Sequence, residues 1–179
     1  MLSKVRHYVP ENTLHSIYHA IFSSTMTYGS IIWGQVQNST TKRISTIQNK
    51  AIRNINFTSR RHNATPLYAK SKILKLEDNV KLQNFLYVHD SLKGSLPVAH
   101  SNIFEPTKNI HKYPTKCSNQ HHIAIDKVNT QTSGINSIKY QATKFCNEMV
   151  NTFPKEKLQN ENRKYCKDYL SKYFLSLYT

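Results

Sequence analysis

Basic side chains between residues 40 and 61 have the spacing of a surface that binds polyanions. A helix is predicted from Thr40 or Thr41 to about Phe57. On a wheel of 100° per residue, its apolar side chains gather on one side and its cations on the other. Two further arginines follow the helix. The predicted contact residues are Lys42, Arg43, Lys50, Arg53, Arg60 and Arg61. Such a surface can neutralise phosphate groups, whereas the simpler alternative is a basic face that contacts only water.

The overall charge of the chain favours the first interpretation. The 179 residues include 25 lysines and arginines against 10 aspartates and glutamates, a formal net charge of +15. A charge excess of this size indicates a polyanionic partner, either nucleic acid or an anionic membrane surface, and we favour nucleic acid. Lysine and asparagine are abundant while arginine is scarce, so AT-rich coding explains part of the excess.

The other reactive side chains do not predict a metal or cofactor site. Three histidines invite a metal interpretation, but carboxylates and cysteines at ligand spacing are missing around them. These histidines are His111, His121 and His122. The cysteines Cys117, Cys146 and Cys166 are far apart and form no C-x-x-C pair, which argues against zinc and against a disulfide framework. We therefore expect no metal, no cofactor and reduced thiols.

No segment of the sequence predicts secretion or a membrane span. Met1 is followed by Leu-Ser-Lys-Val-Arg-His-Tyr, which contains no continuous apolar stretch, so no signal peptide is expected. No run approaches the roughly 18 apolar residues that a spanning helix needs. The expected location is intracellular, in the cytoplasm or the nucleus, and no membrane contact is expected.

A long apolar helix face ahead of residue 40 is the expected support for the basic residues. Apolar side chains recur at i, i+3, i+4, i+7 and i+8 from Leu14, which is one face of an α-helix. The Ser-Ser-Thr run at 23–25 is expected to loosen this helix. Gly29 is expected inside it, and Gly34 is expected to end it in a left-handed cap. The predicted packing core is Leu14, Ile17, Tyr18, Ile21, Phe22, Tyr28 and Trp33.

The later segments predict more helices and one irregular stretch. A helix is expected from about Glu77 to Lys93, with His89 partly exposed on it. Periodicity is lost at 98–133 and returns in two helical segments, at about 135–150 and 159–177. The sequence thus predicts a mainly α protein, with a helical bundle over 1–97, a loop-rich linker over 98–133 and a small helical extension over 134–179.

Several short motifs follow one another along the chain. They are Thr27-Tyr28-Gly29-x-x-x-Trp33-Gly34, Ile47-Gln48-x-Lys50-Ala51-Ile52-Arg53, Thr65-Pro66-Leu67-Tyr68, Leu96-Pro97, His111-x-Tyr113-x-Thr115-Lys116, and Ile138-Lys139-Tyr140-Gln141-Ala142 with Asn147. In their order and spacing they resemble the region just downstream of the reverse-transcriptase domain in jockey-like non-LTR retrotransposons. The resemblance covers nearly the whole chain. Lys116, Ala142 and Cys146 stand where the family has arginine, glycine and tryptophan.

The resemblance implies the C-terminal part of an RNA-directed DNA polymerase, with residues 1–97 forming a thumb-like bundle. In that family a thumb grips the template–primer duplex through its backbone. The implied partners are RNA or an RNA–DNA duplex, and the upstream palm of the same polymerase. The reaction of that family needs two metal ions held by clustered aspartates. The aspartates of this chain include no Asp-Asp pair, so we expect no catalysis by this chain alone.

Two other functions stay open at this point. A helical interaction module would dock its apolar faces on a separate or upstream polymerase domain, and the isolated chain would then expose an apolar patch along Tyr28, Ile32 and Trp33. A stand-alone basic RNA-binding protein is the third hypothesis. It is disfavoured because the sequence has no RRM, KH or zinc-knuckle pattern.

Overall fold

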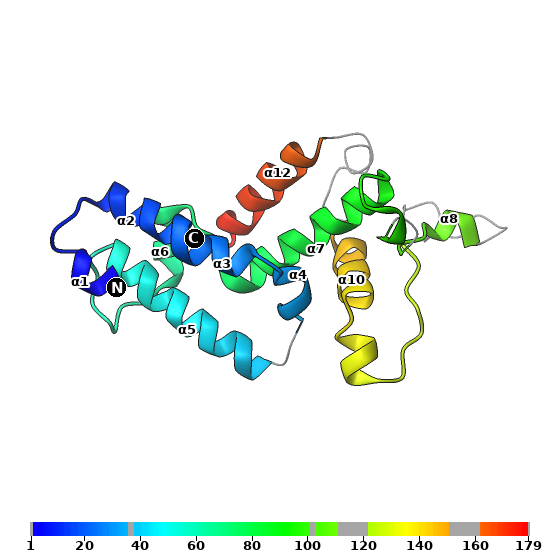
Figure 1. Ribbon diagram of the computed structural model, residues 1–179, viewed down its shortest axis with the longest axis horizontal. Helices are drawn as coiled ribbons and strands as arrows, with labels where there is room; N and C mark the ends of the chain where they lie inside the picture. The colour runs from blue at the N-terminus through cyan, green and yellow to red at the C-terminus, as the bar shows by residue number, and fades with distance from the viewer. Residues whose placement is uncertain (1, 36–37, 101–102, 111–121, 151–161, 179) are drawn as a thin grey trace. The chain divides into compact units, whose positions relative to one another are not determined.

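The fold is mainly α-helical, which confirms the predicted class. The computed structural model describes residues 2–35, 38–100, 103–110, 122–150 and 162–178 (Figure 1). Within these ranges there is no β-strand, only an isolated bridge between Pro106 and Ile123. The helices are α1 (Leu2–Val5), α2 (Glu11–Ile17), η1 (Tyr18–Ser23), α3 (Ser24–Thr27), α4 (Ser30–Trp33), α5 (Asn38–Ile55), α6 (Thr65–Ser71), α7 (Leu76–Leu92), η2 (Val98–His100), α8 (Thr107–Ile110), η3 (Gln131–Ile135), α10 (Ile138–Val150) and α12 (Arg163–Ser176).

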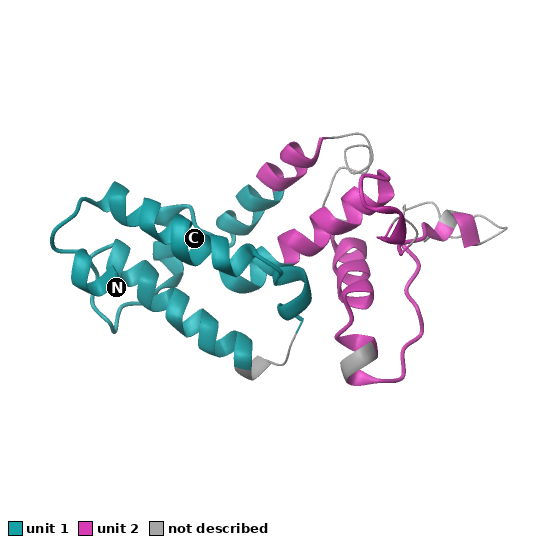
Figure 2. Cartoon of the chain, viewed as in Figure 1, with its two compact units in different colours: residues 1–80, 170–179 teal, residues 81–169 magenta. Residues whose placement is uncertain are grey.

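The chain divides into two compact units (Figure 2). Unit 1 comprises residues 1–80 and 170–179, and unit 2 comprises residues 81–169. These borders differ from the expected segments 1–97, 98–133 and 134–179, because the end of the chain belongs to unit 1. There the Tyr178 hydroxyl donates a hydrogen bond to the Asp78 carboxylate and accepts one from the Lys75 backbone N–H at 3.1 Å. The Lys75 ammonium also lies 4.6 Å from the centre of the Tyr178 ring.

The first long helix is loosened where the sequence predicts it. The hydroxyl of Ser24 donates to the Ala20 carbonyl, and that of Thr25 donates to the Ile21 carbonyl at 2.6 Å. The preceding turn, η1, is a π-helix, so its backbone bonds span one residue more than in an α-helix.

This wider turn changes which side chains reach the core. Leu14 and Tyr18 are buried, while Ile17 and Phe22 are half-buried. The expectation for Ile21 is wrong, because its side chain is 51% exposed. The π-helical turn shifts residues after Tyr18 out of the i, i+3, i+4 register on which the prediction rested.

Tyr28 and Gly29 break the helix instead of continuing it. Gly29 has φ +62°, a left-handed conformation that glycine adopts without steric cost, and it directly precedes α4. Tyr28 is extended at this break and 86% exposed, so its predicted place in the core is wrong. Trp33 is half-buried, and its indole N–H donates to the Tyr28 carbonyl at 2.9 Å. It also packs on the buried cluster of Met26, Leu76 and Val80.

Gly34 lies where the chain passes closely by the side chain of Val80. Its φ is −66°, so the left-handed cap predicted at this position is absent. A Cβ atom here would lie 2.4 Å from the Ser30 carbonyl oxygen and 2.6 Å from a methyl carbon of Val80. Only a residue without a side chain fits between α4 and the start of α7.

Gln48 connects three segments of unit 1 through its buried side-chain amide. Its nitrogen donates to the Tyr18 hydroxyl at 3.0 Å and to the Leu74 carbonyl at 2.9 Å. Its oxygen accepts the Leu76 backbone N–H at 2.9 Å. Burial raises the pKa of the Tyr18 hydroxyl, and the hydrogen bond from Gln48 partly offsets that rise. The amide therefore fixes α5 against η1 and against the entry to α7.

In unit 2, a side-chain amide replaces part of a β-ladder. Asn147 of α10 accepts the Ile123 N–H and donates to the Ile123 carbonyl, both at 2.9 Å. This pair satisfies both backbone groups of Ile123, whose side chain is buried. The irregular segment around Ile123 is thus anchored to α10.

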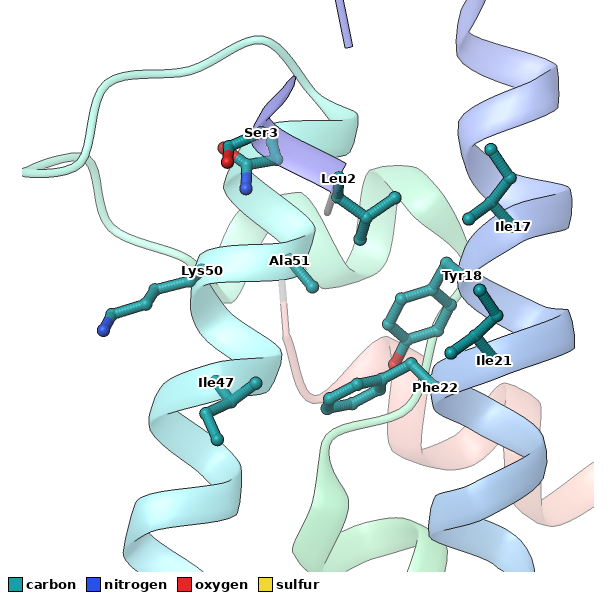
Figure 3. A pocket seen from close by; sticks show the side chains of 10 residues that line it. Leu2, Ser3, Ile17, Tyr18, Ile21, Phe22, Ile47, Lys50 and Ala51 are labelled. Atoms are coloured by element: carbon teal, nitrogen blue, oxygen red, sulfur yellow. The ribbon is translucent and has the colours of Figure 1, made fainter. Parts of the chain in front are cut away.

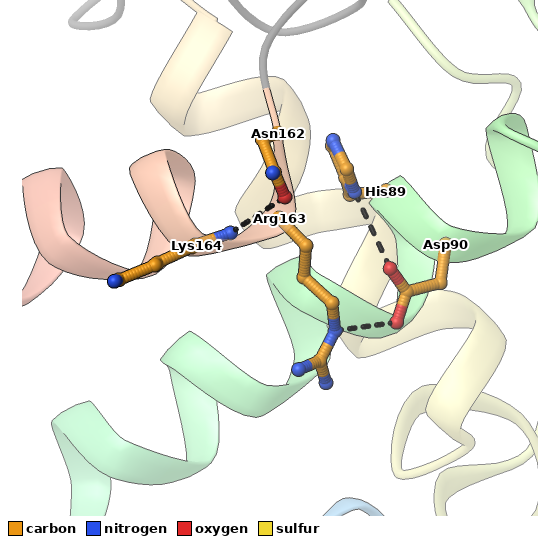
Figure 4. A network of polar contacts seen from close by, with 5 residues as sticks. All are labelled: His89, Asp90, Asn162, Arg163 and Lys164. Atoms are coloured by element: carbon orange, nitrogen blue, oxygen red, sulfur yellow. Dashed lines mark hydrogen bonds and ion pairs between the residues drawn. The ribbon is translucent and has the colours of Figure 1, made fainter.

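A polar network in unit 2 joins the end of α7 to the start of α12 (Figure 4). Arg163 donates through Nε to the Asp90 carboxylate at 2.9 Å, and His89 Nδ1 lies 3.4 Å from the other carboxylate oxygen. His89 is only 4% exposed, so the expectation of a partly exposed side chain is wrong. The Asn162 side chain accepts the Lys164 N–H at 3.3 Å and caps α12. Residues 159–161 of the predicted last helix lie outside the described residues.

Candidate nucleic-acid interface

The helix α5 separates its cations from its apolar side chains. Lys42, Arg43 and Lys50 are exposed and lie within one 100° arc of the helix. Ala51, Ile52 and Ile55 are buried on another side of the helix. Because the buried side chains fix the rotation of α5, the cationic arc is held outward.

Arg53 is the one half-buried cation of the predicted set, and it shapes the loop that follows α5. Its Nε donates to the His62 carbonyl at 2.8 Å, which ties residues 56–64 back to the helix. The backbone carbonyl of Arg53 also accepts the Thr58 N–H at 3.0 Å. Arg53 thus holds the loop after α5 in place and also carries a positive charge.

Arg60 and Arg61 lie at the corner of a tight turn. The His62 backbone N–H donates to the Ser59 carbonyl at 3.1 Å, so the two arginines are the central residues of a β-turn. Both side chains are exposed. Because Arg53 anchors the far side of this turn, the two arginines stay near the C-terminal end of α5. The six predicted residues thus lie on α5 and on the turn that Arg53 ties to this helix, and we call them the basic surface.

The charge of the basic surface is not balanced by nearby acids. From Asn12 to Leu76 the sequence contains no aspartate or glutamate. Among the described residues, none of the six cations forms an ion pair, whereas Asp90 pairs with Arg163 and Asp126 with Lys139. Unpaired cations on one surface give a positive field that attracts polyanions.

An apolar pocket lies beside the basic surface and was not predicted from the sequence (Figure 3). It is a cavity of about 290 Å³ between α1, the α2–η1 helix and α5. Its lining residues are Leu2, Ser3, Ile17, Tyr18, Ile21, Phe22, Ile47, Lys50, Ala51 and Asn54. Ile47, which lies between the apolar and cationic arcs of α5, is 54% exposed. Two of its walls contain apolar pairs at i, i+4 spacing, Ile17–Ile21 and Ile47–Ala51, which a sequence shows as neighbours on one helix face.

A second apolar surface is the patch expected along α4. Tyr28 is 86% exposed and Ile32 is 72% exposed, while Trp33 is half-buried. These side chains surround the break at Gly29.

The histidines considered for a metal are only partly within the described residues. His111 and His121, together with Cys117 and the motif from His111 to Lys116, lie outside them. His122 is half-buried. In the described part of the chain, no three histidine, cysteine, aspartate or glutamate side chains gather at metal-binding distance. Within the same ranges, each helix is too short or too polar to cross a membrane.

No protein-family model, no curated protein and no solved structure matches this chain.

Proposed function

We propose that this chain is the C-terminal part of an RNA-directed DNA polymerase of a non-LTR retrotransposon, and that unit 1 binds its template–primer duplex. The observation that carries the proposal is the basic surface, six cations in one region without an acid between Asn12 and Leu76. The order of the sequence motifs supports the polymerase origin. An intracellular location follows from the same proposal.

The basic surface suits contacts to the backbone of a duplex. Lys42 and Arg53 are separated by 53 − 42 = 11 residues of α5, which is roughly 16 Å at the rise of an α-helix. That length matches about five base-pair steps of a duplex. Lysine and arginine contacts to phosphates position a duplex but carry no sequence information. Binding is therefore expected to be independent of sequence.

This part of the polymerase binds and does not catalyse. Two-metal phosphoryl transfer needs carboxylates clustered around both ions. The four aspartates occupy positions 78, 90, 126 and 168, and Asp78 and Asp90 are already engaged with Tyr178 and Arg163. The metal-binding carboxylates of the reaction belong to the palm, the proposed second partner of this chain.

Replacing two exposed cations of the basic surface should lower the salt dependence of duplex binding. The double variant Lys42→Ala, Lys50→Ala should lose two phosphate contacts. The slope of log affinity against log salt should then become shallower by about 2, at about 0.9 per contact. The measurement is fluorescence anisotropy with a labelled RNA–DNA duplex at several salt concentrations.

The matched control for this experiment removes the same charge elsewhere. Lys167 and Lys172 are exposed on α12, and the double variant Lys167→Ala, Lys172→Ala should keep the slope of the unmodified chain. Equal slopes for all three proteins would remove Lys42 and Lys50 from the interface.

A helical interaction module is the second candidate, and the exposure of Tyr28 and Ile32 favours it. Large apolar side chains that gather on a surface are typical of protein-docking sites. The two functions are compatible if the partner is the polymerase's own palm. If the unmodified chain fails to bind duplex at low salt, docking is the better account of the chain.

A further inference from the structure

The pocket and the basic surface share a residue. Lys50 is one of the residues that line the cavity, and its side chain extends from α5 away from the apolar side chains of the pocket, with the ammonium at its far end (Figure 3). The ammonium of lysine is a compact charge on a flexible four-carbon stem. A ligand that fills the cavity and carries an anionic group outside it can therefore meet the charge of Lys50 at the edge of the pocket.

The walls of the pocket suit a flat, largely apolar group. Ile21 and Ile47 are both more than half exposed. The rings of Phe22 and of the almost fully buried Tyr18 lie between them, with their centroids 5.2 Å apart (Figure 3). The polar lining residues are few. The side-chain oxygen of Asn54 accepts a hydrogen bond from Arg6 at 3.4 Å. The side-chain nitrogen of Asn54 is a hydrogen-bond donor that a ligand in the cavity could use. Ser3 is the other small polar residue of the lining.

We propose that the pocket accepts an unpaired base of the nucleic acid whose backbone lies on the basic surface. The inference rests on the proposed function and adds a substrate class to it, namely duplexes that carry an unpaired nucleotide. Bases stack on aromatic and apolar side chains through their faces, whatever their sequence. Taking a base out of a duplex costs free energy, and that cost is least when the base has no pairing partner. In a nucleotide the sugar joins the base to the phosphate, so a base in the cavity would bring its phosphate to the basic surface, to which Lys50 belongs.

The test compares three RNA–DNA duplexes that differ only at one position. The first is fully paired, the second has one unpaired nucleotide, and the third has an abasic residue in place of that nucleotide. The unpaired base should tighten binding by about fivefold over the abasic duplex, which has the same phosphates. Anisotropy at constant salt measures the three affinities.

Two variants connect this preference to the pocket. The double variant Ile21→Ser, Ile47→Ser removes both exposed walls and should bind all three duplexes equally, with the salt slope unchanged because no charge is altered. The matched control is Ile32→Ser, an exposed isoleucine that does not line the pocket, and it should keep the fivefold preference. Thermal unfolding of each variant checks that unit 1 is folded.

The outcomes separate this inference from the proposed function. If the unmodified chain binds all three duplexes equally and tightly, the pocket does not hold a base while backbone binding stands. If it binds none of them, both proposals fail. A preference that survives in the Ile21, Ile47 variant would assign the base to another site, and would overturn the inference.

Discussion

Replacing Gln48 with leucine should destabilise unit 1 by about 3 kcal/mol. The side chain is only 2% exposed and makes three hydrogen bonds, two of them to backbone groups of Leu74 and Leu76. Leucine has a similar size but can neither accept the Leu76 N–H nor donate to the Leu74 carbonyl. A buried backbone group left without a partner costs about 1–3 kcal/mol, so the loss should exceed any gain from the added apolar surface. The Tyr18 hydroxyl would lose its donor as well.

The measurement is urea unfolding followed by Trp33 fluorescence, because the single tryptophan of the chain reports on unit 1. Asn49→Leu is the matched control. Asn49 is the next residue on α5, half-buried, and accepts one hydrogen bond, from the Tyr68 hydroxyl at 2.9 Å. Its replacement should cost about 1 kcal/mol. Equal stability of the Gln48 variant and the unmodified chain would show that the amide network does not hold α5 in place.

Gly34→Ala should destabilise unit 1 by about 2 to 3 kcal/mol through steric overlap. The backbone at Gly34 is right-handed, so alanine meets no conformational penalty there. Its Cβ would nevertheless lie 2.4 Å from the Ser30 carbonyl oxygen and within 2.7 Å of both Val80 methyl carbons. To remove this overlap, α4 would have to move away from the start of α7, and this movement would also disturb the cluster of Met26, Leu76 and Val80.

Gly29→Ala separates steric overlap from backbone strain. At Gly29 an added Cβ would only touch Trp33, at 3.7 Å, but φ is +62° and an L-residue is strained there. The expected cost is about 1 kcal/mol, smaller than at Gly34. Both variants can be compared by the same urea unfolding, with circular dichroism as a second signal. A larger loss at Gly29 than at Gly34 would contradict the close approach of α4 and α7.

Helical periodicity predicted much of the fold. The separation of cations from isoleucines placed α5 and its exposed face close to where the structure has them. The α7 helix likewise begins and ends within one residue of its predicted bounds. The predictions that were wrong concern residues whose position depends on tertiary contacts or on unusual turns. The π-helical turn moved Ile21 out of the core, and the break at Gly29 did the same for Tyr28.

Three features depend on neighbours that are distant in the sequence. From the sequence, a glycine that caps a helix and a glycine that makes room for a neighbouring side chain look the same. The contact of Gly34 with Val80 is visible only in the structure. The return of Tyr178 to Asp78 joins residues 100 positions apart, which periodicity does not report. The pocket needs walls from α2–η1 and from α5 at the same time. The exposure of Lys42, Arg43, Lys50, Arg60 and Arg61, in contrast, agrees with their local spacing, because solvent-exposed charges need no partner in the fold. Arg53 is half-buried, and its bond to the His62 carbonyl could not be predicted from spacing.

The proposal that the basic surface binds an RNA–DNA duplex is tested most directly by the salt dependence of binding in two variants that lose the same number of charges. One variant replaces the six cations of the basic surface with glutamine. The other replaces six exposed lysines elsewhere, Lys70, Lys127, Lys144, Lys164, Lys167 and Lys172. The unmodified chain should bind an RNA–DNA duplex with a slope of log affinity against log salt of about −5, from six contacts at about 0.9 each.

We predict that the first variant loses nearly all of this slope and the second keeps it. Equal loss in both variants would mean that net charge alone attracts the duplex, and the basic surface would then have no special role.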